Sequence, residues 1–299
     1  MTDWSGSSTQ AQMLAWARGR LRGLPGSNPS QEARALLEWA LGVESLWSAP
    51  DVVGARAAER LRSGVARRRH REPLQHITGR MWFRGLTLEA RPGVFVVRPE
   101  TEVVAGAAID AAGRVPAGSG GGPGGAPLVV DLCAGSGAIA VSMACEVPAA
   151  RVVAVELDPR AVALARANAR ALAPDRVVVV HGDAMSALEE WDGRVDVVVS
   201  NPPYVPSADR PTQAEALTDP EAALFGGGED GLVVPRGIVH RAARLLAPGG
   251  TLVVEHAESQ SAALRGIAAQ AGLVGARTLP DLAGRDRMLV ASRPGEDDV

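Results

Sequence analysis

The stretch VVVSNPPYVPS, residues 197–207, carries residues suited to holding a small polar group. β-Branched residues run into Asn201-Pro202-Pro203-Tyr204, and Tyr204 is the only tyrosine in the chain. Neither proline has an N–H for a strand ladder, so a strand is expected to end here in a rigid turn. The Asn201 side-chain oxygen and the freed Pro202 carbonyl can then accept the two N–H groups of an amide or amine. We expect the Tyr204 ring to lie against the flat face of that group.

A second candidate is the stretch VVDLCAGSGAIAVSM, typical of a buried strand, a glycine-rich turn and the start of a helix. Gly135 and Gly137 let the backbone pass close to a ligand, and the helix N-terminus offers free N–H groups. Glu156 ends the following strand, where a carboxylate can accept hydrogen bonds from ribose hydroxyls. Together with Ala140, the glycines match the dinucleotide pattern G-x-G-x-x-G/A. S-Adenosylmethionine-binding proteins use the same geometry with a carboxylate that ends the first strand, here Asp131.

A third expected strand ends in VVVVHGDAM, which places Asp183 where it could meet an adenine amino group. The alternative for Asp183 is a turn residue that caps the next element. His181 has no other metal-type residues in register and is interpreted as an ordinary strand-end residue. Cys133 is interpreted as a small filler of the turn, because no histidine lies nearby in sequence to activate its thiol.

The Asn-Pro-Pro-Tyr corner distinguishes between the two candidate cofactors, a dinucleotide and S-adenosylmethionine. A carboxamide nitrogen is a poor nucleophile that needs orientation, and positioning alone can remove about 7–11 kcal/mol of a barrier. Acceptors on both N–H groups also stabilise the charge that develops on nitrogen as a new bond forms. The matching electrophile is the methyl group of a sulfonium, and a hydride-transfer enzyme has no use for such a corner. The sequence therefore predicts S-adenosylmethionine as cofactor, with Asn201, Pro202 and Tyr204 as catalytic residues.

The elements that position these residues are expected from Leu128 onward. Strands are expected at 128–132, 151–156, 176–180, 194–199, 251–255, 274–279 and 287–292, and helices at 137–147, 159–172, 231–247 and 258–272. Strands that alternate with helices indicate parallel βαβ units and a doubly wound α/β sheet. The closing pair of strands, joined by a short loop, predicts one antiparallel strand.

Residues 9–71 are expected to form a small bundle of three helices. Ser30 is expected to cap the second helix and Gly42 to end it. Four of the six tryptophans lie in this part of the chain and are interpreted as core residues, with contact to a protein partner as the alternative: Trp4, Trp16, Trp39 and Trp47.

Short β-rich runs in residues 72–97 predict hairpins, because glycines and prolines divide them. Another helix is expected to open near Pro99 and Glu100. The run VPAGSGGGPGGAP, residues 115–127, is expected to be a flexible, solvent-exposed loop.

Composition limits the function classes. The chain has 299 residues, 46% of them hydrophobic, a formal net charge of −3 and a pI of about 6.0. It therefore has no global basic field to attract nucleic acid. The two cysteines indicate a reducing compartment and are too few for a cysteine zinc site, so no metal is expected. No signal peptide is recognised, and no apolar run approaches the ~18 residues that span a bilayer, so we expect a soluble cytoplasmic protein.

Several blocks of the sequence resemble one family. EPLQHITG, FRGLTLEARPGVFVVRPETE, DLCAGSGAIA, SNPPYVP, PEAALFGGGEDGL, LAPGGTLVVEHAESQ and DLAGRDRMLVA occur in the order seen in the protein-(glutamine-N5) methyltransferases of peptide chain release factors, the HemK or PrmC type. The resemblance covers roughly residues 70–293, with a looser helical match before that. It implies methyl transfer to the glutamine of the Gly-Gly-Gln loop in class 1 release factors, which tunes translation termination, with S-adenosylhomocysteine as product.

The resemblance also implies an architecture and a site. Residues 1–71 would form a helical substrate-binding domain, 72–97 a β-hairpin linker, and 98–299 a Rossmann-like class I methyltransferase domain with a mostly parallel seven-stranded sheet. The cofactor would contact, besides Asp131, the residues Cys133, Ala134, Gly135, Ser136, Gly137, Glu156, Asp183, Ala184 and Asn201. The glutamine amide would lie at Asn201, Pro202, Pro203 and Tyr204, and we expect a monomer with no membrane or nucleic-acid partner.

Three residues depart from the family pattern. Glu156 stands where aspartate is usual, and its carboxylate is expected to keep the ribose contact. Ala184 stands where a bulkier, often aromatic residue flanks adenine, which removes that stacking contact. Val97 replaces a proline before Arg98.

Three other functions fit parts of the sequence. The Asn-Pro-Pro-Tyr motif also occurs in N-methyltransferases that act on adenine or guanine in nucleic acid, against which the acidic pI stands. A catalytically silent assembly or ribosome-associated protein could keep the cofactor fold, although Asn201 and Tyr204 are intact. An NAD-dependent reductase is the third alternative, and the same corner argues against it.

Overall fold

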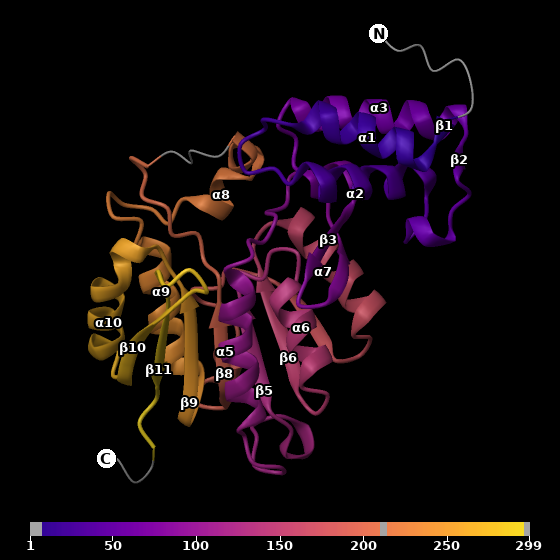
Figure 1. Ribbon diagram of the computed structural model, residues 1–299. Coiled ribbons are helices and arrows are strands. Elements are labelled where there is room, and N and C mark those ends of the chain that lie inside the picture. The colour runs from indigo at the N-terminus through magenta and orange to yellow at the C-terminus, as the bar shows by residue number, and fades with distance from the viewer. Residues whose placement is uncertain (1–7, 210–213, 296–299) are drawn as a thin grey trace. The chain divides into compact units, whose positions relative to one another are not determined.

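The computed structural model of the chain describes residues 8–209 and 214–295, which fall into two compact units (Figure 1). The first, called the helical unit, comprises residues up to Arg80 together with 90–92 and 214–218. The second, called the sheet unit, comprises 81–89, 93–209 and 219–295. The expected division of roles among residues 1–71, 72–97 and 98–299 stays a prediction.

Three helices pack around one apolar core in the helical unit. They are α1 (Gln10–Leu21), α2 (Pro29–Leu41) and α3 (Ala55–Arg69), with the short helix α4 (Leu74–Thr78), the 3₁₀ turns η1 (Leu46–Ser48) and η4 (Ala214–Thr218), and a two-stranded pairing of β1 (Ser8–Thr9) with β2 (Val52–Val53). Gly42 ends α2 in the left-handed conformation, as expected. The expectation that Ser30 caps α2 is wrong, because the side chain of Asn28 accepts from Gln31 N and Pro29 takes the first helical position.

The tryptophans of this unit divide into two groups. Trp16 and Trp39 pack against the helical core, as expected, and the Arg60 guanidinium lies 4.8 Å from the centre of the Trp39 ring. The expectation for Trp47 is wrong, since this residue in the exposed turn η1 is 92% exposed. Trp4 lies outside the described residues.

The β-rich run at 72–97 contains one hairpin only. β3 (Arg80–Phe83) pairs with β4 (Leu86–Glu89), while residues 74–78 form α4 and residues 94–97 form no strand. The expectation of strands in those two stretches is therefore wrong. In the first of them Gly79, in the left-handed conformation, ends α4 and directs the chain into β3.

A seven-stranded, mostly parallel sheet forms the centre of the sheet unit and confirms the predicted fold class. Its order is β10-β11-β9-β8-β5-β6-β7, and β11 runs antiparallel to both of its neighbours, while the other neighbouring pairs are parallel. The strands are β5 (Leu128–Leu132), β6 (Arg151–Glu156), β7 (Val177–His181), β8 (Val195–Ser200), β9 (Leu246–Glu255), β10 (Val274–Pro280) and β11 (Asp286–Ser292).

Helices cover both faces of this sheet (Figure 1). One face carries α5 (Thr101–Gly113), α6 (Ala138–Glu146) and α7 (Pro159–Leu172), and the other carries α9 (Val233–Leu245) and α10 (Ser261–Gln270). The short α8 (Glu221–Leu224) and the 3₁₀ turns η2 (Pro123–Gly125), η3 (Glu189–Trp191) and η5 (Glu258–Gln260) complete the unit. None of the helices in the described ranges is long and apolar enough to cross a membrane.

The strand register places four strand ends in one row. Leu132 is paired with Val155 on one side and with Ser200 on the other, and Ser200 is paired in turn with Val254. The residues that follow these four come to the same edge of the sheet. This edge is where open α/β sheets bind ligands.

The glycine-rich run at 115–127 is held on the sheet unit, so the expectation of a flexible loop is wrong, although residues 116–119, 123 and 124 are solvent-exposed as expected. Both Gly121 N and Leu128 N donate to Asp196 Oδ2, at 2.9 and 2.7 Å. A Cβ at Gly121 would lie 1.8 Å from the Arg194 carbonyl oxygen. Gly120, Gly121, Gly122 and Gly125 serve close backbone packing, which composition alone does not distinguish from a linker.

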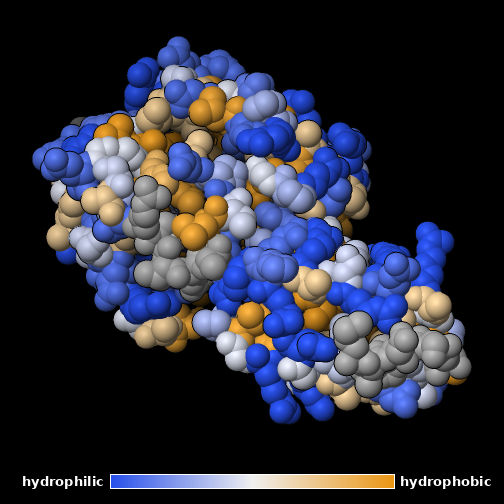
Figure 2. All heavy atoms as spheres, turned by 90° about the horizontal axis from the view of Figure 1, so that it is seen from above, coloured by the Kyte–Doolittle hydropathy of each residue, from blue (hydrophilic) through white to orange (hydrophobic). Residues whose placement is uncertain are grey.

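On the face drawn in Figure 2, hydrophobic residues lie in small groups between hydrophilic ones. The most exposed large hydrophobic residues include Trp47 and Leu282, at 92% and 95% exposure.

Candidate active site

The turn after β5 brings three residues into the left-handed conformation. Cys133, Gly135 and Gly137 have φ values of 63°, 57° and 79°. A Cβ at Gly135 would meet open space, whereas one at Gly137 would lie 3.2 Å from Cβ of Ala165 in α7. Gly135 therefore lets a ligand approach the backbone, and Gly137 serves the packing of α6 against α7.

Glu156 joins this turn to the end of β6. Its Oε2 accepts from Gly135 N at 2.7 Å, and its Oε1 accepts from Leu157 N and Asp158 N at 2.8 Å each. A carboxylate has about four acceptor sites, so three backbone bonds leave room for a hydroxyl. The Glu156 side chain thus holds the turn and can still accept a hydrogen bond from a ribose hydroxyl, as expected.

Asp131 lies fully buried beneath the turn, one residue before β5 ends. Its Oδ2 accepts from Ala140 N in the first turn of α6 at 3.1 Å, while its Oδ1 is buried without a hydrogen-bond partner among the described residues. Burial raises the pKa of Asp131 to about 8, and the nearby Glu156 carboxylate adds to the rise. A buried carboxyl with an unused oxygen suits a cationic ligand group.

The other predicted residues near the turn have mixed placements. Burial raises the pKa of the Cys133 thiol, which supports its interpretation as a filler. Asp183 is exposed, and its side chain accepts from Met185 N at 2.9 Å in a local turn, close to the turn-residue alternative. Ala184 belongs to the core on the α9 side, which leaves only its backbone for a ligand. His181 contacts the Leu157 carbonyl through Nε2 at 2.9 Å.

Asn201 has a fixed orientation. Its Nδ2 donates to Oγ1 of Thr101 at 3.1 Å, a residue 1% exposed at the start of α5. Ser200 fixes the backbone just before it, because its hydroxyl donates to the Leu132 carbonyl at 2.7 Å. With its nitrogen occupied by Thr101, Asn201 keeps Oδ1 as an acceptor for a bound group.

Tyr204 is held at both ends. Its hydroxyl donates to Oε1 of Glu255 at 3.1 Å, and its backbone carbonyl accepts from Gln260 Nε2 at 2.8 Å. The same Gln260 nitrogen donates to the Asp230 carbonyl at 2.8 Å. Burial, followed by the Glu255 charge, raises the pKa of Tyr204, so the phenol is neutral at ordinary pH.

The segment 224–232 packs against the corner. Val205 N donates to the Leu224 carbonyl at 2.8 Å, and Gly226 N donates back to the Val205 carbonyl at 3.0 Å. A Cβ at Gly231 would lie 2.3 Å from the Tyr204 carbonyl oxygen. Backbone contact this close explains why glycines follow the corner in sequence.

Sequence reasoning identified the hydrogen-bond acceptors of the site but missed the residues that hold them in place. Thr101, Glu255 and Gln260 occur in blocks that carried the family resemblance, yet none was singled out. The usable signal was the position of Glu255, which ends a parallel strand at the ligand edge as Glu156 does. The roles assigned to the predicted site residues stay predictions.

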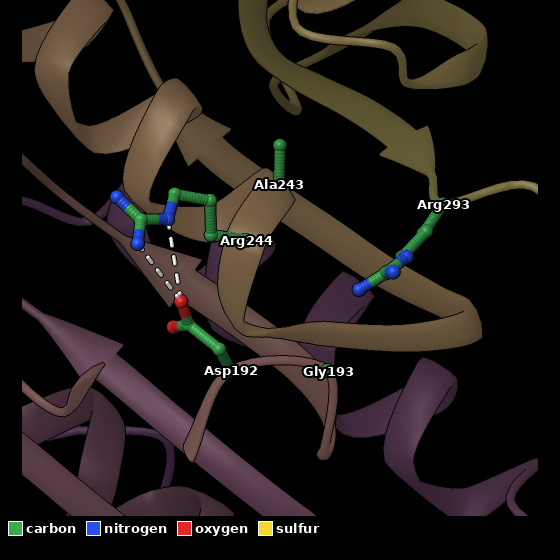
Figure 3. A pocket seen from close by; sticks show the side chains of 5 residues that line it. All are labelled: Asp192, Gly193, Ala243, Arg244 and Arg293. Carbon is green, nitrogen blue, oxygen red and sulfur yellow. Dashed lines mark hydrogen bonds and ion pairs between the residues drawn. The ribbon is translucent and has the colours of Figure 1, made fainter. Parts of the chain in front are cut away.

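A separate surface pocket does not contain these residues. Its volume is about 380 Å³, and Figure 3 shows the residues that line it, Asp192, Gly193, Ala243, Arg244 and Arg293. It lies before β8 begins, at the other end of that strand from the site. The guanidinium of Arg244 pairs with the Asp192 carboxylate at 3.2 Å, and the guanidinium of Arg293 donates to the Leu246 carbonyl.

The residues at the ligand edge fit S-adenosylmethionine. Asp131 offers a buried oxygen to its positive charge, Gly135 leaves the backbone open, and Glu156 retains acceptor capacity for ribose hydroxyls. Asn201 lies at the end of the neighbouring strand β8.

Comparison with known proteins agrees with this geometry. The family descriptions "PrmC N-terminal domain" and "Methyltransferase small domain" match residues 12–79 and 125–237. The chain is 44% identical over 285 residues to a release factor glutamine methyltransferase of Streptomyces coelicolor, covering 94% of this chain and 96% of that protein. One from Bifidobacterium longum is 40% identical over 293 residues, covering 92% and 96%.

Two further proteins are similar to this chain over a smaller part of its length. A 4-amino-L-phenylalanine/4-methylamino-L-phenylalanine methyltransferase of Streptomyces pristinaespiralis is 47% identical over 201 residues, covering 67% of this chain and 66% of that protein. A 16S rRNA N2 G1207 methyltransferase from T. thermophilus, solved with AdoMet and guanosine, has a TM-score of 0.50 at 23% identity, covering 72% of this chain and 49% of that one. The latter likeness shows the fold alone.

Proposed function

We propose that this chain, which belongs to the family of release factor glutamine methyltransferases, transfers a methyl group from S-adenosylmethionine to the side-chain amide nitrogen of the glutamine in the release factor Gly-Gly-Gln loop. Bound S-adenosylmethionine supplies a methyl group on a positively charged sulfur. The products are N5-methylglutamine, S-adenosylhomocysteine and one proton.

The substrate amide is held by two acceptors. Asn201 Oδ1 and the Pro202 carbonyl accept its two N–H groups, and the neutral Tyr204 ring packs against its flat face. Accepting hydrogen bonds from these N–H groups raises the electron density on the nitrogen. It also stabilises the positive charge that develops there as the carbon–nitrogen bond forms. One N–H proton then leaves to solvent. Support comes from the Thr101 contact, which fixes the Asn201 amide with its oxygen free to accept.

The cofactor is held by the turn after β5 and the end of β6. Asp131 offers its unpaired oxygen to the positive charge of the ligand, and Glu156 accepts from the ribose hydroxyls. The backbone of residues 133–137 would hold the ligand, and Gly135 leaves open space for it beside the backbone. Asp183 and the Ala184 backbone flank the adenine without an aromatic stack. The Asn201 side chain also borders the cofactor.

The observation that carries the substrate assignment is whole-length similarity to release factor enzymes. The relatives from S. coelicolor and B. longum match the helical unit as well as the sheet unit, and residues 12–79 match the N-terminal domain of that family. The nucleic-acid alternative lacks such support, because the rRNA enzyme shares only the fold. On this reading the chain acts in the cytoplasm as a monomer, with the release factor as its partner.

Mass spectrometry tests the proposal. The protein is incubated with S-adenosylmethionine and a class 1 release factor, and the Gly-Gly-Gln peptide is expected to gain one methyl group. A release factor with that glutamine changed to alanine is the control, and it should gain none. Methyl transfer to 4-amino-L-phenylalanine or to nucleic acid, with none to the release factor, would reject the substrate assignment.

A further inference from the structure

We propose that Gln260 is a positioning residue for the methyl transfer, because its side-chain amide holds the backbone of Tyr204 at the Asn-Pro-Pro-Tyr corner. This inference rests on the proposed function. Both ends of the Gln260 amide are occupied within the protein, so the residue acts through Tyr204, whose ring packs against the substrate amide. It contacts neither the glutamine nor the cofactor.

The side-chain amide of Gln260 connects three stretches of the chain. The residue ends the 3₁₀ turn η5 and is 4% exposed. Its Oε1 accepts from Ala257 N at 3.0 Å, and its Nε2 donates to the carbonyls of Tyr204 and Asp230 at 2.8 Å each. These two carbonyls lie 56 and 30 residues earlier in the chain. One buried side chain thus ties the corner and the segment 224–232 to the turn that follows β9.

This arrangement needs the two donors of a glutamine. A carboxamide has two N–H groups, so each of the two carbonyls can accept one of them, whereas a carboxylate or a thioether has no donor. Among the described residues, no other group donates to the carbonyl of Tyr204 or of Asp230. Carbonyl groups shielded from water are nearly always paired in folded proteins. Loss of the Gln260 amide should therefore shift the backbone at both places.

The segment 224–232 lies directly against the corner, so such a shift is passed on. A Cβ at Gly226 would lie 2.8 Å from the Pro203 carbonyl oxygen, and one at Gly231 would lie 2.3 Å from the Tyr204 carbonyl oxygen. Atoms packed this closely transmit a displacement to one another. The shift therefore reaches the residues at which the substrate amide is proposed to lie.

The first test compares Gln260→Met with the wild type, since methionine keeps the length of the side chain but has no donor. We expect kcat with the release factor to fall about 10- to 100-fold, as for a misplaced reacting group, with S-adenosylmethionine affinity within about twofold. Gln270→Met is the matched control, because Gln270 ends α10 and is exposed, and it should keep wild-type kcat. A folded Gln260→Met enzyme with wild-type kcat would overturn the proposal.

Gln260→Glu separates the two donors of the side chain from its acceptor, and it also covers the case in which Gln260→Met does not fold. A glutamate carboxylate can still accept from Ala257 N, but it donates to neither carbonyl. We expect kcat to fall at least as far as in Gln260→Met, because the negative charge repels the two carbonyl oxygens. Wild-type kcat in a folded Gln260→Glu protein would show that the corner does not depend on the donors, and would reject the proposal.

A spectroscopic measurement separates this inference from the proposed function. Tyr204 is the only tyrosine of the chain, so tyrosine labelled with ¹³C at its carbonyl gives one NMR resonance that reports on the hydrogen bond from Gln260. It should move upfield in Gln260→Met and stay in place in Gln270→Met, whatever substrate the enzyme methylates. An unchanged resonance in Gln260→Met would contradict the role of Gln260. A wild type that methylates no release factor would instead reject the proposed function.

Discussion

Some residues of the site can contact a ligand, and others hold these ligand-contacting residues in place. Sequence reasoning identified Asn201, Tyr204, Gly135 and Glu156, because their types and positions at strand ends state their chemistry. It treated Gly135 and Gly137 alike, since both lie in one turn. The structure separates them, because only a built backbone shows that Gly137 faces Ala165 while Gly135 faces open space.

This separation predicts different effects for two alanine variants. Both positions have positive φ, so each variant should lose about 1–2 kcal/mol of unfolding free energy. Gly137→Ala should lose about 1–3 kcal/mol more, because its Cβ would press on Ala165 at 3.2 Å. Gly135→Ala should instead bind S-adenosylmethionine at least about tenfold more weakly, equal to about 1.4 kcal/mol. Urea unfolding and isothermal titration measure the two effects, and unchanged affinity in Gly135→Ala would contradict its assigned role.

Among the elements, alternation of β-branched runs with helices predicted the sheet unit well. Strong hydrophobic periodicity and a terminating residue such as Gly42 allow a helix or strand to be predicted from local sequence. Prediction failed where tertiary contacts decide, as in residues 74–78, where a run containing apolar residues forms α4. It also failed at 115–127, because the hydrogen bonds from Gly121 and Leu128 to Asp196 span about seventy residues of chain.

The helix α3 carries a further feature that sequence reasoning did not reach. Arg68 near its end is 4% exposed and pairs with Glu32 of α2 at 2.9 Å and with Glu215 at 2.7 Å. Its neighbour Arg69 is exposed. Both belong to the run of three arginines, Arg67 to Arg69, in the last turn of α3.

Replacing these arginines should therefore have unequal effects. Arg68→Ala leaves the largely buried Glu32 carboxylate without its ion-pair partner, while Glu215 keeps its pair with Arg71. Removing one partner of a buried pair typically costs about 3–5 kcal/mol of unfolding free energy. Arg69→Ala is the control and should change it by less than about 0.5 kcal/mol. Denaturation followed by tryptophan fluorescence reports on this unit, because Trp16 and Trp39 pack on its core. Equal stability of the two variants would refute the structural role of Arg68.

At the scale of the whole molecule, the fold brings distant segments to one edge. Asn201 meets Thr101 from 100 residues away, and Tyr204 meets Glu255 from 51 residues away. Parallel strands of an α/β sheet end at one edge, and the sequence predicted candidate site residues at the ends of such strands, although it did not predict the strand order. It did not predict the side-chain partners, because these depend on register and on the helix α5, which lies before the first strand of the sheet.

Two buried carboxyls give the molecule a predicted stability profile. Burial raises the pKa of Asp131 to about 8 and that of Glu255 to about 7, above the ordinary values of 3.8 and 4.5 for these side chains. The folded state then binds more protons than the unfolded state between these values, so this contribution is full at low pH and is lost as pH rises to about 8. His256, whose pKa burial lowers, acts in the opposite sense near pH 6.5.

The variant Asp131→Asn isolates one of these contributions. Relative to the variant, ligand-free wild type should lose on the order of a few kcal/mol of unfolding free energy between about pH 4 and about pH 8. The asparagine can still accept from Ala140 N, so the helix cap is kept. Urea unfolding across this range provides the measurement. A constant difference between the two proteins would mean that Asp131 titrates normally.

The most direct test of the central claim is a crystal structure with S-adenosylhomocysteine and a Gly-Gly-Gln peptide. We predict that the glutamine amide nitrogen lies about 3 Å from both Asn201 Oδ1 and the Pro202 carbonyl oxygen, with the cofactor sulfur above the amide plane, on the face away from the Tyr204 ring. A glutamine bound elsewhere, or an Asn201 side chain whose NH₂ faces the peptide, would contradict the account.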